Sequence, residues 1–466
     1  MRDAHDLAFV ILAAGRGKRM RSARPKVLHE LCGRPLLLHA TALASALGAA
    51  RSIVVVGTGQ DEVGPVLDEH AADVEVVIQR ELLGTGHAVL QTREVLAGHQ
   101  GPLLVMYADH ALFRPETLQG LIDAWAAGAD LALLTGELPD PTGYGRIVRD
   151  PGGRIERIVE QRDASARELA ILESNLGVYV ARADWMLEAV SKLDRENRQN
   201  EFLLPDVVAT ALQAGLRVES APLGDPEEAF GINTRVDLAQ AEAILRRRIA
   251  RRWMLEGVSF VDPEHTYVDV EVEIGTETIL EPGCRLRGRT RLGSGCRVAV
   301  GAVLDDTTAG DRVWIKPHCW AEQARIGDDC SIGPSAHLRA GTVLGDGVRI
   351  GNFVEVKNST LGAGTKADHL SYLGDADVGE GVTIGCGAIT VNYDGETKHR
   401  TVIEDGAFVG CNANLIAPVT VGRDVYVAAG STITREVEEG SLAVARARQR
   451  NIEGWRERRF GRKREE

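Results

Sequence analysis

The feature that most constrains the fold is a six-residue repeat in the second half of this 466-residue chain. Aliphatic residues recur at every sixth position in three runs, and glycine often follows them. This spacing is typical of a parallel β-helix, in which each aliphatic side chain stacks on its counterpart one coil away. The runs are Ile274, Leu280, Leu286, Leu292, Val298, Leu304; Ile326, Ile332, Leu338, Leu344, Ile350, Val356; and Ile403, Val409, Leu415, Val421, Val427, Ile433.

Two stretches break the repeat, at about 357–377 and at 391–401, and the second reads as a loop extruded from the helix. Interruptions of a solenoid tend to lie on its functional face. Cys284, Cys296 and Cys330 each follow an aliphatic position by four residues, so we expect them to pack inside. The seven cysteines show no Cys-x-x-Cys spacing, which argues against a metal cluster and for a reducing cytoplasm.

The first half alternates short apolar runs with helical stretches, which predicts a Rossmann-like α/β domain. We expect a mostly parallel sheet with helices on both faces and a ligand outside the carboxyl ends of the strands. The expected strands are 8–12, 52–56, 74–79, 103–107, 130–138 and 175–180, and the expected helices include 34–49 and 114–127.

These patterns divide the chain into four parts. The predicted parts are an α/β domain at 1–234, a linker helix at 235–256, a β-helix at 257–445 and a basic tail at 446–466. The net charge of −13 disfavours nucleic acid and anionic membranes as partners, so anionic substrates need local clusters of Lys and Arg. The apolar run near the start is too short for a signal peptide or a membrane span, and we expect a cytoplasmic protein.

A glycine-rich loop follows strand 8–12 and reads LAAGRGKRM, then PKVLHEL. It lacks the third glycine of a dinucleotide loop, and its Gly-Lys pair is not followed by the Ser or Thr of a Walker loop. Backbone amides together with Arg19 and Lys26 suit a triphosphate. Asp109, which follows strand 103–107, is placed to hold Mg²⁺ against phosphate oxygens, although a strand-end aspartate is about as often a helix N-cap.

Polar residues converge on the breaks of the β-helix. Arg339 and Lys357 lie about one coil apart and could clamp one phosphate. His369 lies close to Tyr372, and a neutral imidazole could take a proton from an ammonium nucleophile, whereas a single histidine is more often structural. The extruded loop adds Asn392, Tyr393 and Lys398.

The glycine loop resembles the opening signature of sugar-nucleotide pyrophosphorylases, with Lys18 in place of the usual Thr or Ser. The segments QRELLGTGHAV, PTGYGRIV, VEQRDAS, ESNLGVY and FGINTRVDLAQAE extend the resemblance, as does LRAGTVLGDGVRIGNFVEVKNSTLGAGTKADHLSYLG in the second half. From residue 8 to about 455 the chain resembles the bacterial bifunctional enzymes of UDP-N-acetylglucosamine synthesis. Those enzymes join a uridylyltransferase to an acetyl-CoA-dependent glucosamine-1-phosphate acetyltransferase.

The resemblance implies a left-handed β-helix, an exception to the right-handed crossover rule, and a homotrimer with acetyltransferase sites between subunits. It implies acetylation of glucosamine 1-phosphate by acetyl-CoA, followed by transfer of uridylyl from UTP to N-acetylglucosamine 1-phosphate with release of pyrophosphate. His369 would be the general base of the first reaction, with Asn392 orienting the base or the amine. Arg19, Lys26 and Mg²⁺ would carry the second by positioning and charge neutralisation. The product is a cell-wall precursor.

The resemblance also implies which residues bind each ligand. Those expected to bind UTP and the UDP-sugar are Leu12, Ala13, Ala14, Gly15, Lys26, Gln79, Gly84, Thr85, Tyr107, Ala108, Asp109, Gly145, Glu160, Asn175 and Asn233. Asp109 and Asn233 are also the expected metal ligands. Glucosamine 1-phosphate is assigned to Arg339, Lys357, Tyr372, Asn392 and Lys398, and acetyl-CoA to Thr383, Cys386, Asn392, Tyr393, Cys411, Ala429 and Arg446.

Some positions depart from the family pattern. Ala108 replaces a glycine that faces the nucleotide, and the segment NRQNEFLLPDVV lacks the usual Gly-Glu-Tyr-Tyr-Leu-Thr-Asp. Thr383, Cys386 and Cys411 stand where Asn, Ala and Ser are expected near acetyl-CoA. Two other interpretations stay open: a nucleotidyltransferase, thymidylyl or adenylyl, whose β-helix only regulates or assembles, and a silent trimeric scaffold that senses nucleotide.

Overall fold

The computed structural model describes residues 6–58 and 61–461 and divides the chain into two compact units, Met1–Arg247 and Arg248–Glu466. The division falls inside helix α8 (Arg235–Leu255), which matches the helix expected at 235–256. The first five residues of the predicted α/β domain and the last five of the predicted tail lie outside the described residues.

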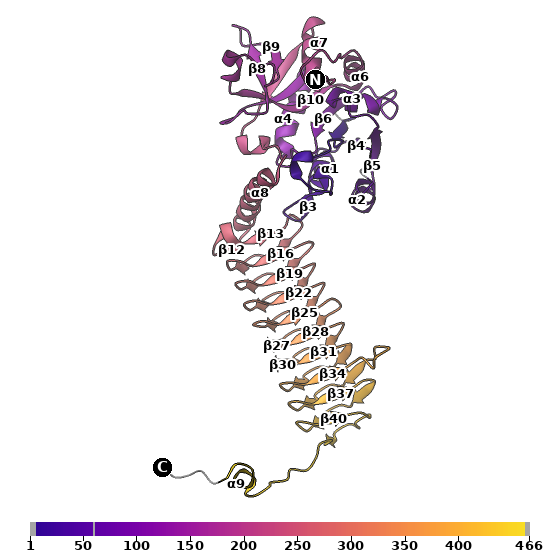
Figure 1. The fold of residues 1–466 in the computed structure, drawn as a ribbon, viewed down its shortest axis with the longest axis vertical. Coiled ribbons are helices and arrows are strands. Elements are labelled where there is room, and N and C mark those ends of the chain that lie inside the picture. The colour runs from indigo at the N-terminus through magenta and orange to yellow at the C-terminus, as the bar shows by residue number, and fades with distance from the viewer. Residues whose placement is uncertain (1–5, 59–60, 462–466) are drawn as a thin grey trace. The chain divides into compact units, whose positions relative to one another are not determined.

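The first unit contains a nine-stranded sheet among its described residues, with the main order β11-β7-β10-β6-β1-β4-β5 (Figure 1). Along this main order the neighbours are parallel except at β10, which runs antiparallel to β6 and to β7, so the mostly parallel sheet is confirmed. Strands β8 and β9 lie off this path, where β8 runs antiparallel to β10 and to β9. The strands are β1 (Ala8–Leu12), β4 (Arg51–Gly57), β5 (Val74–Gln79), β6 (Pro102–Tyr107), β7 (Leu131–Glu137), β8 (Gly145–Arg149), β9 (Ile155–Val159), β10 (Glu173–Arg182) and β11 (Val218–Pro222). A separate hairpin joins β2 (Glu30–Leu31) to β3 (Arg34–Pro35).

Helices cover both faces of this sheet, as its sequence pattern predicts. Along β1, Phe9 and Ile11 pack with α1 and α4 in one core cluster, while Val10 and Leu12 pack with α3, α6 and α7 in another. The helix expected at 34–49 begins only at Leu36, because the two residues before it pair in β3. The helices are α1 (Leu36–Ala46), α2 (Val63–His70), α3 (Thr85–Leu90), α4 (Pro115–Ala126), α5 (Ala166–Leu169), α6 (Ala183–Ser191) and α7 (Val207–Gln213).

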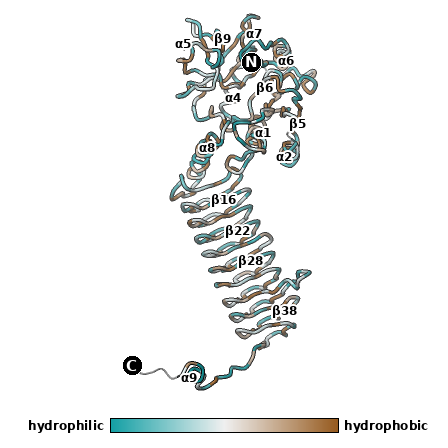
Figure 2. Tube along the Cα trace, in the orientation of Figure 1, coloured by the Kyte–Doolittle hydropathy of each residue, from teal (hydrophilic) through white to brown (hydrophobic). Residues whose placement is uncertain are grey.

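The second unit is the predicted left-handed parallel β-helix, built from three parallel sheets to which each complete coil adds one strand (Figure 1). Every aliphatic residue of the three sequence runs is buried inside it. Hydrophobic and hydrophilic residues alternate over short stretches along its coils, because each short strand sends one side inward (Figure 2). We call the turn from the first to the second sheet the first corner and the turn from the second to the third sheet the second corner.

The strands of the first sheet are β12 (Ser259–Phe260), β15 (Ile279–Leu280), β18 (Arg297–Val298), β21 (Trp314–Ile315), β24 (Ser331–Ile332), β27 (Arg349–Asn352), β30 (Lys366–His369), β33 (Thr383–Ile384), β36 (Phe408–Val409), β39 (Tyr426–Val427) and β41 (Leu442–Ala443). Those of the second are β13 (Tyr267–Val268), β16 (Arg285–Arg287), β19 (Val303–Asp305), β22 (Trp320–Glu322), β25 (His337–Leu338), β28 (Glu355–Lys357), β31 (Tyr372–Gly374), β34 (Ile389–Val391), β37 (Asn414–Ile416) and β40 (Thr432–Ile433). Those of the third are β14 (Glu273–Ile274), β17 (Arg291–Leu292), β20 (Thr308–Ala309), β23 (Arg325–Ile326), β26 (Val343–Leu344), β29 (Thr360–Leu361), β32 (Ala376–Val378), β35 (Thr401–Ile403) and β38 (Val419–Val421).

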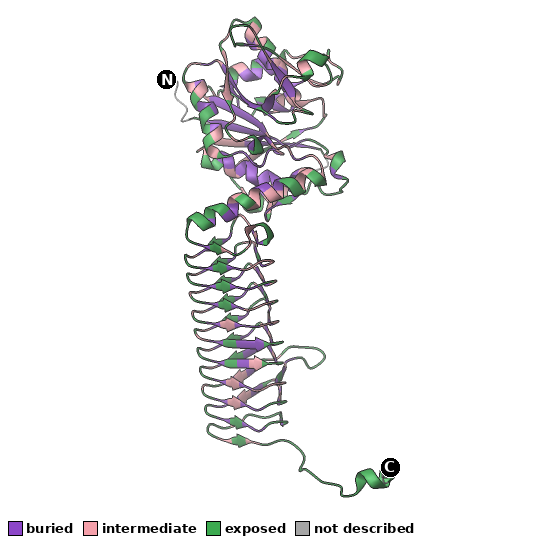
Figure 3. Cartoon of the chain, turned by 90° about the vertical axis from the view of Figure 1, so that its left-hand side faces the viewer, coloured by how far each residue is buried: buried purple, intermediate pink, exposed green. Residues whose placement is uncertain are grey.

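The break expected at 357–377 is wrong. Strands β29 to β32 continue all three ladders through it, with no gap in the pairing of the described residues. The spacing of inward residues shortens from six to five at the second corner, as between Val356 and Leu361, which shifts the phase of the pattern without interrupting the helix. The loop expected at 391–401 is confirmed: it leaves β34, forms a bridge between Tyr393 and Lys398, and returns at β35 (Figure 3).

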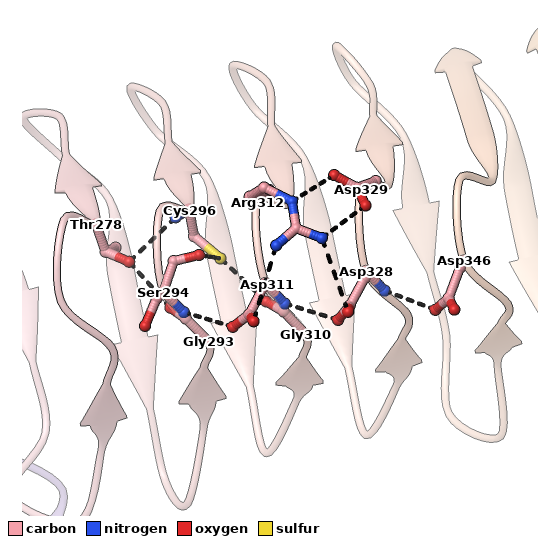
Figure 4. Close-up of polar contacts among 10 residues, drawn as sticks. All are labelled: Thr278, Gly293, Ser294, Cys296, Gly310, Asp311, Arg312, Asp328, Asp329 and Asp346. Atoms are coloured by element: carbon pink, nitrogen blue, oxygen red, sulfur yellow. Dashed lines mark hydrogen bonds and ion pairs between the residues drawn. The ribbon is translucent and has the colours of Figure 1, made fainter.

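Polar contacts, some buried and some exposed, tie neighbouring coils together (Figure 4). Thr278 Oγ1 accepts a hydrogen bond from the backbone N–H of Cys296 at 3.2 Å, and the Cys296 thiol donates to the carbonyl of Gly310 at 3.1 Å. Burial raises the pKa of Cys284 to about 12 and that of Cys330 to about 11. Cys284, Cys296 and Cys330 are at most 2% exposed, so their predicted packing role is confirmed, and burial also suppresses the reactive thiolate.

The basic tail is exposed from Arg446 onward and contains the short helix α9 (Trp455–Phe460) as far as the structure describes it. Across residues 6–58 and 61–461, every helix is too short or too polar to span a lipid bilayer.

Candidate active sites

A cavity of 330 Å³ lies at the carboxyl end of β1 in the first unit. The loop after β1 forms one wall, the start of α3 forms another, and the end of β6 closes the base. Most of the predicted nucleotide contacts meet here: Leu12, Ala13, Ala14, Gly15, Lys26, Gln79, Gly84, Thr85, Tyr107 and Asp109. Residues more than ninety positions apart in the sequence are thus gathered around one space, as the topology of a doubly wound sheet requires.

Local backbone geometry explains the shape of the loop. Gly17 has a φ of 57°, and a β-carbon there would lie 2.6 Å from Cβ of Lys26. Only glycine allows the lysine to approach so closely. The residue before Lys26 is Pro25, which holds extended backbone and starts the 3₁₀ turn Lys26–Leu28. The loop therefore presents the lysine amine in a fixed direction.

A second, larger cavity of 810 Å³ adjoins the first. Tyr107 and Asp109 line both cavities, so the two spaces meet at the end of β6. The remaining predicted contacts in this unit line the larger cavity: Arg19, Gly145, Glu160, Asn175 and Asn233. The arrangement offers two adjoining cavities with charged groups at their junction. We call the smaller one the nucleotide compartment and the larger one the sugar compartment, after the ligands expected there.

Ala108 is the exception among the predicted nucleotide contacts. It lines neither cavity; it is only 1% exposed and packs in the core cluster with α1 and α4. Its backbone N–H donates to the carbonyl of Leu12 at 3.1 Å, which ties β6 to β1. The methyl group that replaces the family's glycine therefore faces the core and leaves both cavities free.

Opposite charges meet at the junction of the cavities. Lys26 Nζ lies 2.6 Å from Asp109 Oδ2 and 3.2 Å from Asn233 Oδ1, and an Arg19 nitrogen lies 2.9 Å from the same Asn233 oxygen. Burial opposes ionisation of Asp109, yet Lys26 keeps the pKa of this carboxyl below its ordinary value. Asp109 is therefore an anion at neutral pH, in a position from which water is largely excluded.

The donor set at this junction fits a hard divalent cation. Asp109 Oδ1 is buried and has no hydrogen-bond partner within the described part of the chain. Asn233 turns its side-chain oxygen toward the same lysine amine that contacts Asp109. Carboxylate and amide oxygens are ligands that Mg²⁺ prefers, and it usually takes one or two of them plus water and phosphate.

The sugar compartment contains a carboxyl group, Glu160, that is a weaker acid than usual. Burial, reinforced by Asp206 and Asp163, raises the pKa of Glu160 above its ordinary value. A β-carbon at Gly145 would lie 3.0 Å from Glu160 Oε1, so this glycine keeps space beside the carboxyl. Asn175 Nδ2 donates to the hydroxyl of Tyr179 at 2.7 Å, which fixes the amide in place. The compartment therefore offers fixed acceptors suited to sugar hydroxyls.

His110 was not identified from the sequence, although it lines the sugar compartment. Its ring stacks on Phe113 with centroids 5.3 Å apart, and Nδ1 is buried with no hydrogen-bond partner among the described residues. Burial lowers the pKa of this imidazole, so it is neutral. The only signal available in the sequence was its place beside Asp109.

In the second unit, some of the residues predicted to serve acetylation form a column along the first corner. His369, Cys386, Cys411 and Ala429 each come two residues after an inward aliphatic or alanine residue, in consecutive coils. Backbone hydrogen bonds of 2.7 to 3.0 Å connect the turns in this column: Gly387 to Leu370, Asn412 to Cys386 and Gly430 to Cys411. Arg446 extends the column, since its guanidinium donates to the carbonyl of Ala429 at 2.7 Å. His369 itself is exposed.

The cationic residues gather at the second corner. Lys398 and Arg339 lower the pKa of Lys357, which means that three positive charges face one another. Arg339 also pairs with Glu355 at 3.0 Å. Glu355 and Asp375 offset part of this positive charge, and the remainder favours an anion as the ligand of this corner.

Asp375 organises this corner and was not predicted. It is buried, accepts hydrogen bonds from the amides of Asn358 and Asn392, and has a pKa held below its ordinary value by these amides and the nearby lysines despite its burial. Asn392 is itself 9% exposed, so its amide is held rigidly at the base of the extruded loop. Sequence motifs did not point to Asp375, because its role is to hold other side chains in place.

Strand β31 separates the two corners within one chain. Tyr372 lies at the start of β31, directly after the first corner, and a β-carbon at Gly374 would lie 2.3 Å from its hydroxyl. The ring therefore extends along the outer face of the strand toward the lysines. Thr383 and Tyr393 are not brought into the column: Thr383 lies on the outer face of the first sheet, and Tyr393 lies in the extruded loop.

Comparison with known proteins places these features in a family. Residues 9–178 match the model of the MobA-like NTP transferase domain, residues 263–363 match the GMPPB C-terminal domain, and residues 400–435 match the bacterial transferase hexapeptide, six repeats. The chain is 46% identical to the bifunctional protein GlmU of Pelobacter propionicus over 97% of its own length and 98% of that protein. It is 47% identical to the GlmU of a Geobacillus species over 96% of both chains. It is 46% identical to that of Trichlorobacter lovleyi over 96% of this chain and 97% of that protein.

Proposed function

Because this chain belongs to the family of bifunctional GlmU proteins, we propose a specific set of its residues for each of two reactions. The chain is a uridylyltransferase and a glucosamine-1-phosphate acetyltransferase that together make UDP-N-acetylglucosamine. The observation that supports this most directly is that each compact unit carries its own polar, convergent residue set. We assign the uridylyltransferase to 1–234, the linker to 235–256, the acetyltransferase to 257–445 and the basic tail to 446–466.

In the uridylyltransferase, UTP occupies the smaller cavity and the sugar phosphate the larger one. Gln79 carries a donor and an acceptor, as a uracil edge requires, and Glu160 and Asn175 bind sugar hydroxyls. The phosphate oxygen of N-acetylglucosamine 1-phosphate attacks the α-phosphorus of UTP, and pyrophosphate leaves. The attacking oxygen is already ionised, so the step depends on alignment and on neutralisation of charge by Arg19 and Lys26.

Asp109 and Asn233 would hold Mg²⁺, which when bound supplies positive charge to the phosphate oxygens. The buried Oδ1 of Asp109, which has no hydrogen-bond partner among the described residues, supports this assignment. Lys26 contacts the same two side chains, so it balances the charge of Asp109 and remains beside the phosphates.

In the acetyltransferase, acetyl-CoA lies along the first-corner column and glucosamine 1-phosphate extends across β31. The phosphate is held by Arg339, Lys357 and Lys398 at the second corner, with Tyr372 alongside. His369 removes a proton from the amine, the nitrogen attacks the thioester carbon, and coenzyme A leaves as the thiol. Thr383, Asn392, Tyr393 and Arg446 complete the acyl-donor contacts.

We assign the assembly to a homotrimer in the cytoplasm, in which acetyltransferase sites form between subunits. Two observations support contributions from more than one copy. Thr383 and Tyr393 lie away from the first-corner column of their own chain, and the outer face of the first sheet exposes Trp314 and Tyr426. Light scattering by the purified protein tests the mass, and a monomer with full acetyltransferase activity would contradict the assignment.

The experiment that tests the function is a pair of assays on one preparation. Thiol release from acetyl-CoA is measured with and without glucosamine 1-phosphate, and pyrophosphate release from UTP with and without N-acetylglucosamine 1-phosphate. Both releases should depend on the sugar. Pyrophosphate without thiol release would leave a nucleotidyltransferase with a structural β-helix, and neither release would leave a silent scaffold. Replacing UTP by TTP or ATP distinguishes the donor.

A further inference from the structure

Two cysteines occupy equivalent positions in neighbouring coils of the first-corner column. Ile384 pairs with Val409 in the first sheet, and Cys386 and Cys411 each follow by two residues. The backbone N–H of Asn412 donates to the carbonyl of Cys386 at 2.7 Å, so the pairing continues through the turn. Neighbouring parallel strands lie about 4.8 Å apart, which is inside the range of about 4.4–6.8 Å between the α-carbons of a disulfide. Both cysteines are free thiols.

This pair differs from the other cysteines in its access to solvent. Cys411 is exposed and Cys386 is partly exposed. Cys284, Cys296, Cys319 and Cys330 are buried, and burial raises the pKa of each thiol, which suppresses the nucleophilic thiolate. The remaining cysteine, Cys32, is buried in the other unit. Among the described residues, these two thiols combine a neighbouring partner with access to a reagent.

The two cysteines also lie within the column that is proposed to bind acetyl-CoA. His369 is one coil before Cys386 in the column, and Ala429 is one coil after Cys411. The family pattern has Ala at position 386 and Ser at position 411, so the pair of thiols is a feature of this chain. Any bond between the two coils would alter the surface along which the acyl donor lies.

We propose that Cys386 and Cys411 form a reversible oxidation site that closes to an intrachain disulfide and switches off the acetyltransferase. The oxidant is a low-molecular-weight disulfide. The Cys411 thiolate attacks one sulfur of the reagent and releases one thiol, which leaves a mixed disulfide on Cys411. The Cys386 thiolate then attacks the Cys411 sulfur and releases the second thiol. Two protein thiols lose two protons and two electrons in total, and the reagent is reduced to two thiols.

The geometry makes this bond easy to reverse. Disulfide β-carbons lie about 3.5–4.5 Å apart, somewhat less than the spacing of parallel neighbours, so closure must contract the corner locally. Exposed or strained disulfides have more oxidising potentials and are the labile ones. The switch rests on the proposed acetyltransferase function. Its first consequence is that the surface proposed to bind acetyl-CoA shifts beside His369.

The test uses the full-length protein, first reduced and then treated with oxidised glutathione. The intact mass should fall by two hydrogens, and peptide mapping should connect Cys386 to Cys411. Thiol release from acetyl-CoA should drop, on the order of 10²-fold when a site is displaced by about an ångström, and dithiothreitol should restore it. Pyrophosphate release by the same sample should not change. The acetyltransferase rate of the oxidised protein is compared with the rate of the same preparation before oxidation.

Single variants separate the switch from simple thiol modification. In Cys386→Ala the reaction should stop at glutathione attached to Cys411, and in Cys411→Ser no crosslink should form. The proposal is overturned by glutathione adducts without an internal bond in the unaltered chain, by a crosslink between two copies, or by an internal bond that leaves acetyltransferase activity unchanged. If the reduced protein showed no acetylation at all, the proposed function and the inhibition would both fail, whereas the bond would still be decided by mass.

Discussion

At the scale of single residues, Asp109 concentrates the chemistry of the first unit. It is a partly buried anion, and its buried oxygen Oδ1 has no hydrogen-bond partner among the described residues. Asp109→Asn keeps the shape of the side chain and removes the charge. We expect pyrophosphate release to fall on the order of 10²–10³-fold, the usual loss when an electrostatic contact to reacting charge is removed. Thiol release by the other unit should stay within about twofold, since the two reactions use separate residue sets.

The matched control is Asp123→Asn, an exposed aspartate on α4 whose carboxylate accepts from Gln119. It should leave both rates near those of the unaltered enzyme. Removal of divalent cations by EDTA should reproduce the selective loss seen in Asp109→Asn. Equal loss of both activities in Asp109→Asn would show that the substitution damages the fold and not the site.

His369 is the corresponding residue of the second unit, where it is exposed at the first corner. His369→Ala removes the proposed base, and general-base catalysis contributes roughly 10²–10⁴-fold, so thiol release should fall within that range. His318→Ala, at the same corner three coils earlier in the first sheet, should retain acetylation. An unchanged acetylation rate in His369→Ala would assign the proton transfer to another group.

Residue types with strong chemical roles could be predicted individually, and supporting residues could not. Lys26, Asp109 and Asn233 meet as expected, because charged groups in a loop at the end of a parallel sheet have few other uses. Asp375 and His110 were missed, since their roles depend on contacts that only the folded chain creates. Ala108 was expected to contact the nucleotide, but it lines neither cavity. Successive side chains of a strand point to opposite faces, and the register with β1 decides that this side chain points to the core.

At the scale of elements, the start of α3 is the most sharply constrained part of the nucleotide cavity. Gly84 has a φ of 119°, and a β-carbon there would lie 2.5 Å from the carbonyl oxygen of Phe202. Gly84→Ala must therefore move α3 or the segment around Phe202. We expect the KM for UTP to rise roughly tenfold or more, because small displacements at a site are costly, while acetylation stays unchanged.

Gly48→Ala is the control that separates the cost of a positive φ from the steric clash that Gly84→Ala creates with Phe202. Gly48 also has a positive φ, of 65°, but a β-carbon there would meet no atom within 4 Å. This variant should lower stability slightly and leave the KM for UTP as it is. A similar rise in KM for both variants would attribute the effect to general loosening of the first unit.

The β-helix shows which aspects of an element can be predicted from spacing. A period of six fixes which residues face inward, so every aliphatic position of the three runs was predicted correctly, whereas the inward residues between the runs were not identified. The apparent break at 357–377 arose because a five-residue side shifts the phase while the backbone pairing continues. Strict periodicity cannot distinguish a shortened turn from an interruption, whereas backbone hydrogen bonding tolerates the first and not the second.

At the scale of the whole molecule, the two compact units have separate hydrophobic interiors, and this predicts separate thermal failure of the two activities. Leu104 is fully buried in β6, and Leu415 is 2% exposed in β37. Truncating a buried leucine to alanine costs about 2–5 kcal/mol, which lowers the unfolding temperature by roughly 4–20 °C for a unit of this size. Leu104→Ala should lower the temperature at which pyrophosphate release is lost and leave that of thiol release in place. Leu415→Ala should do the reverse, and simultaneous loss of both activities in either variant would mean that the units unfold as one.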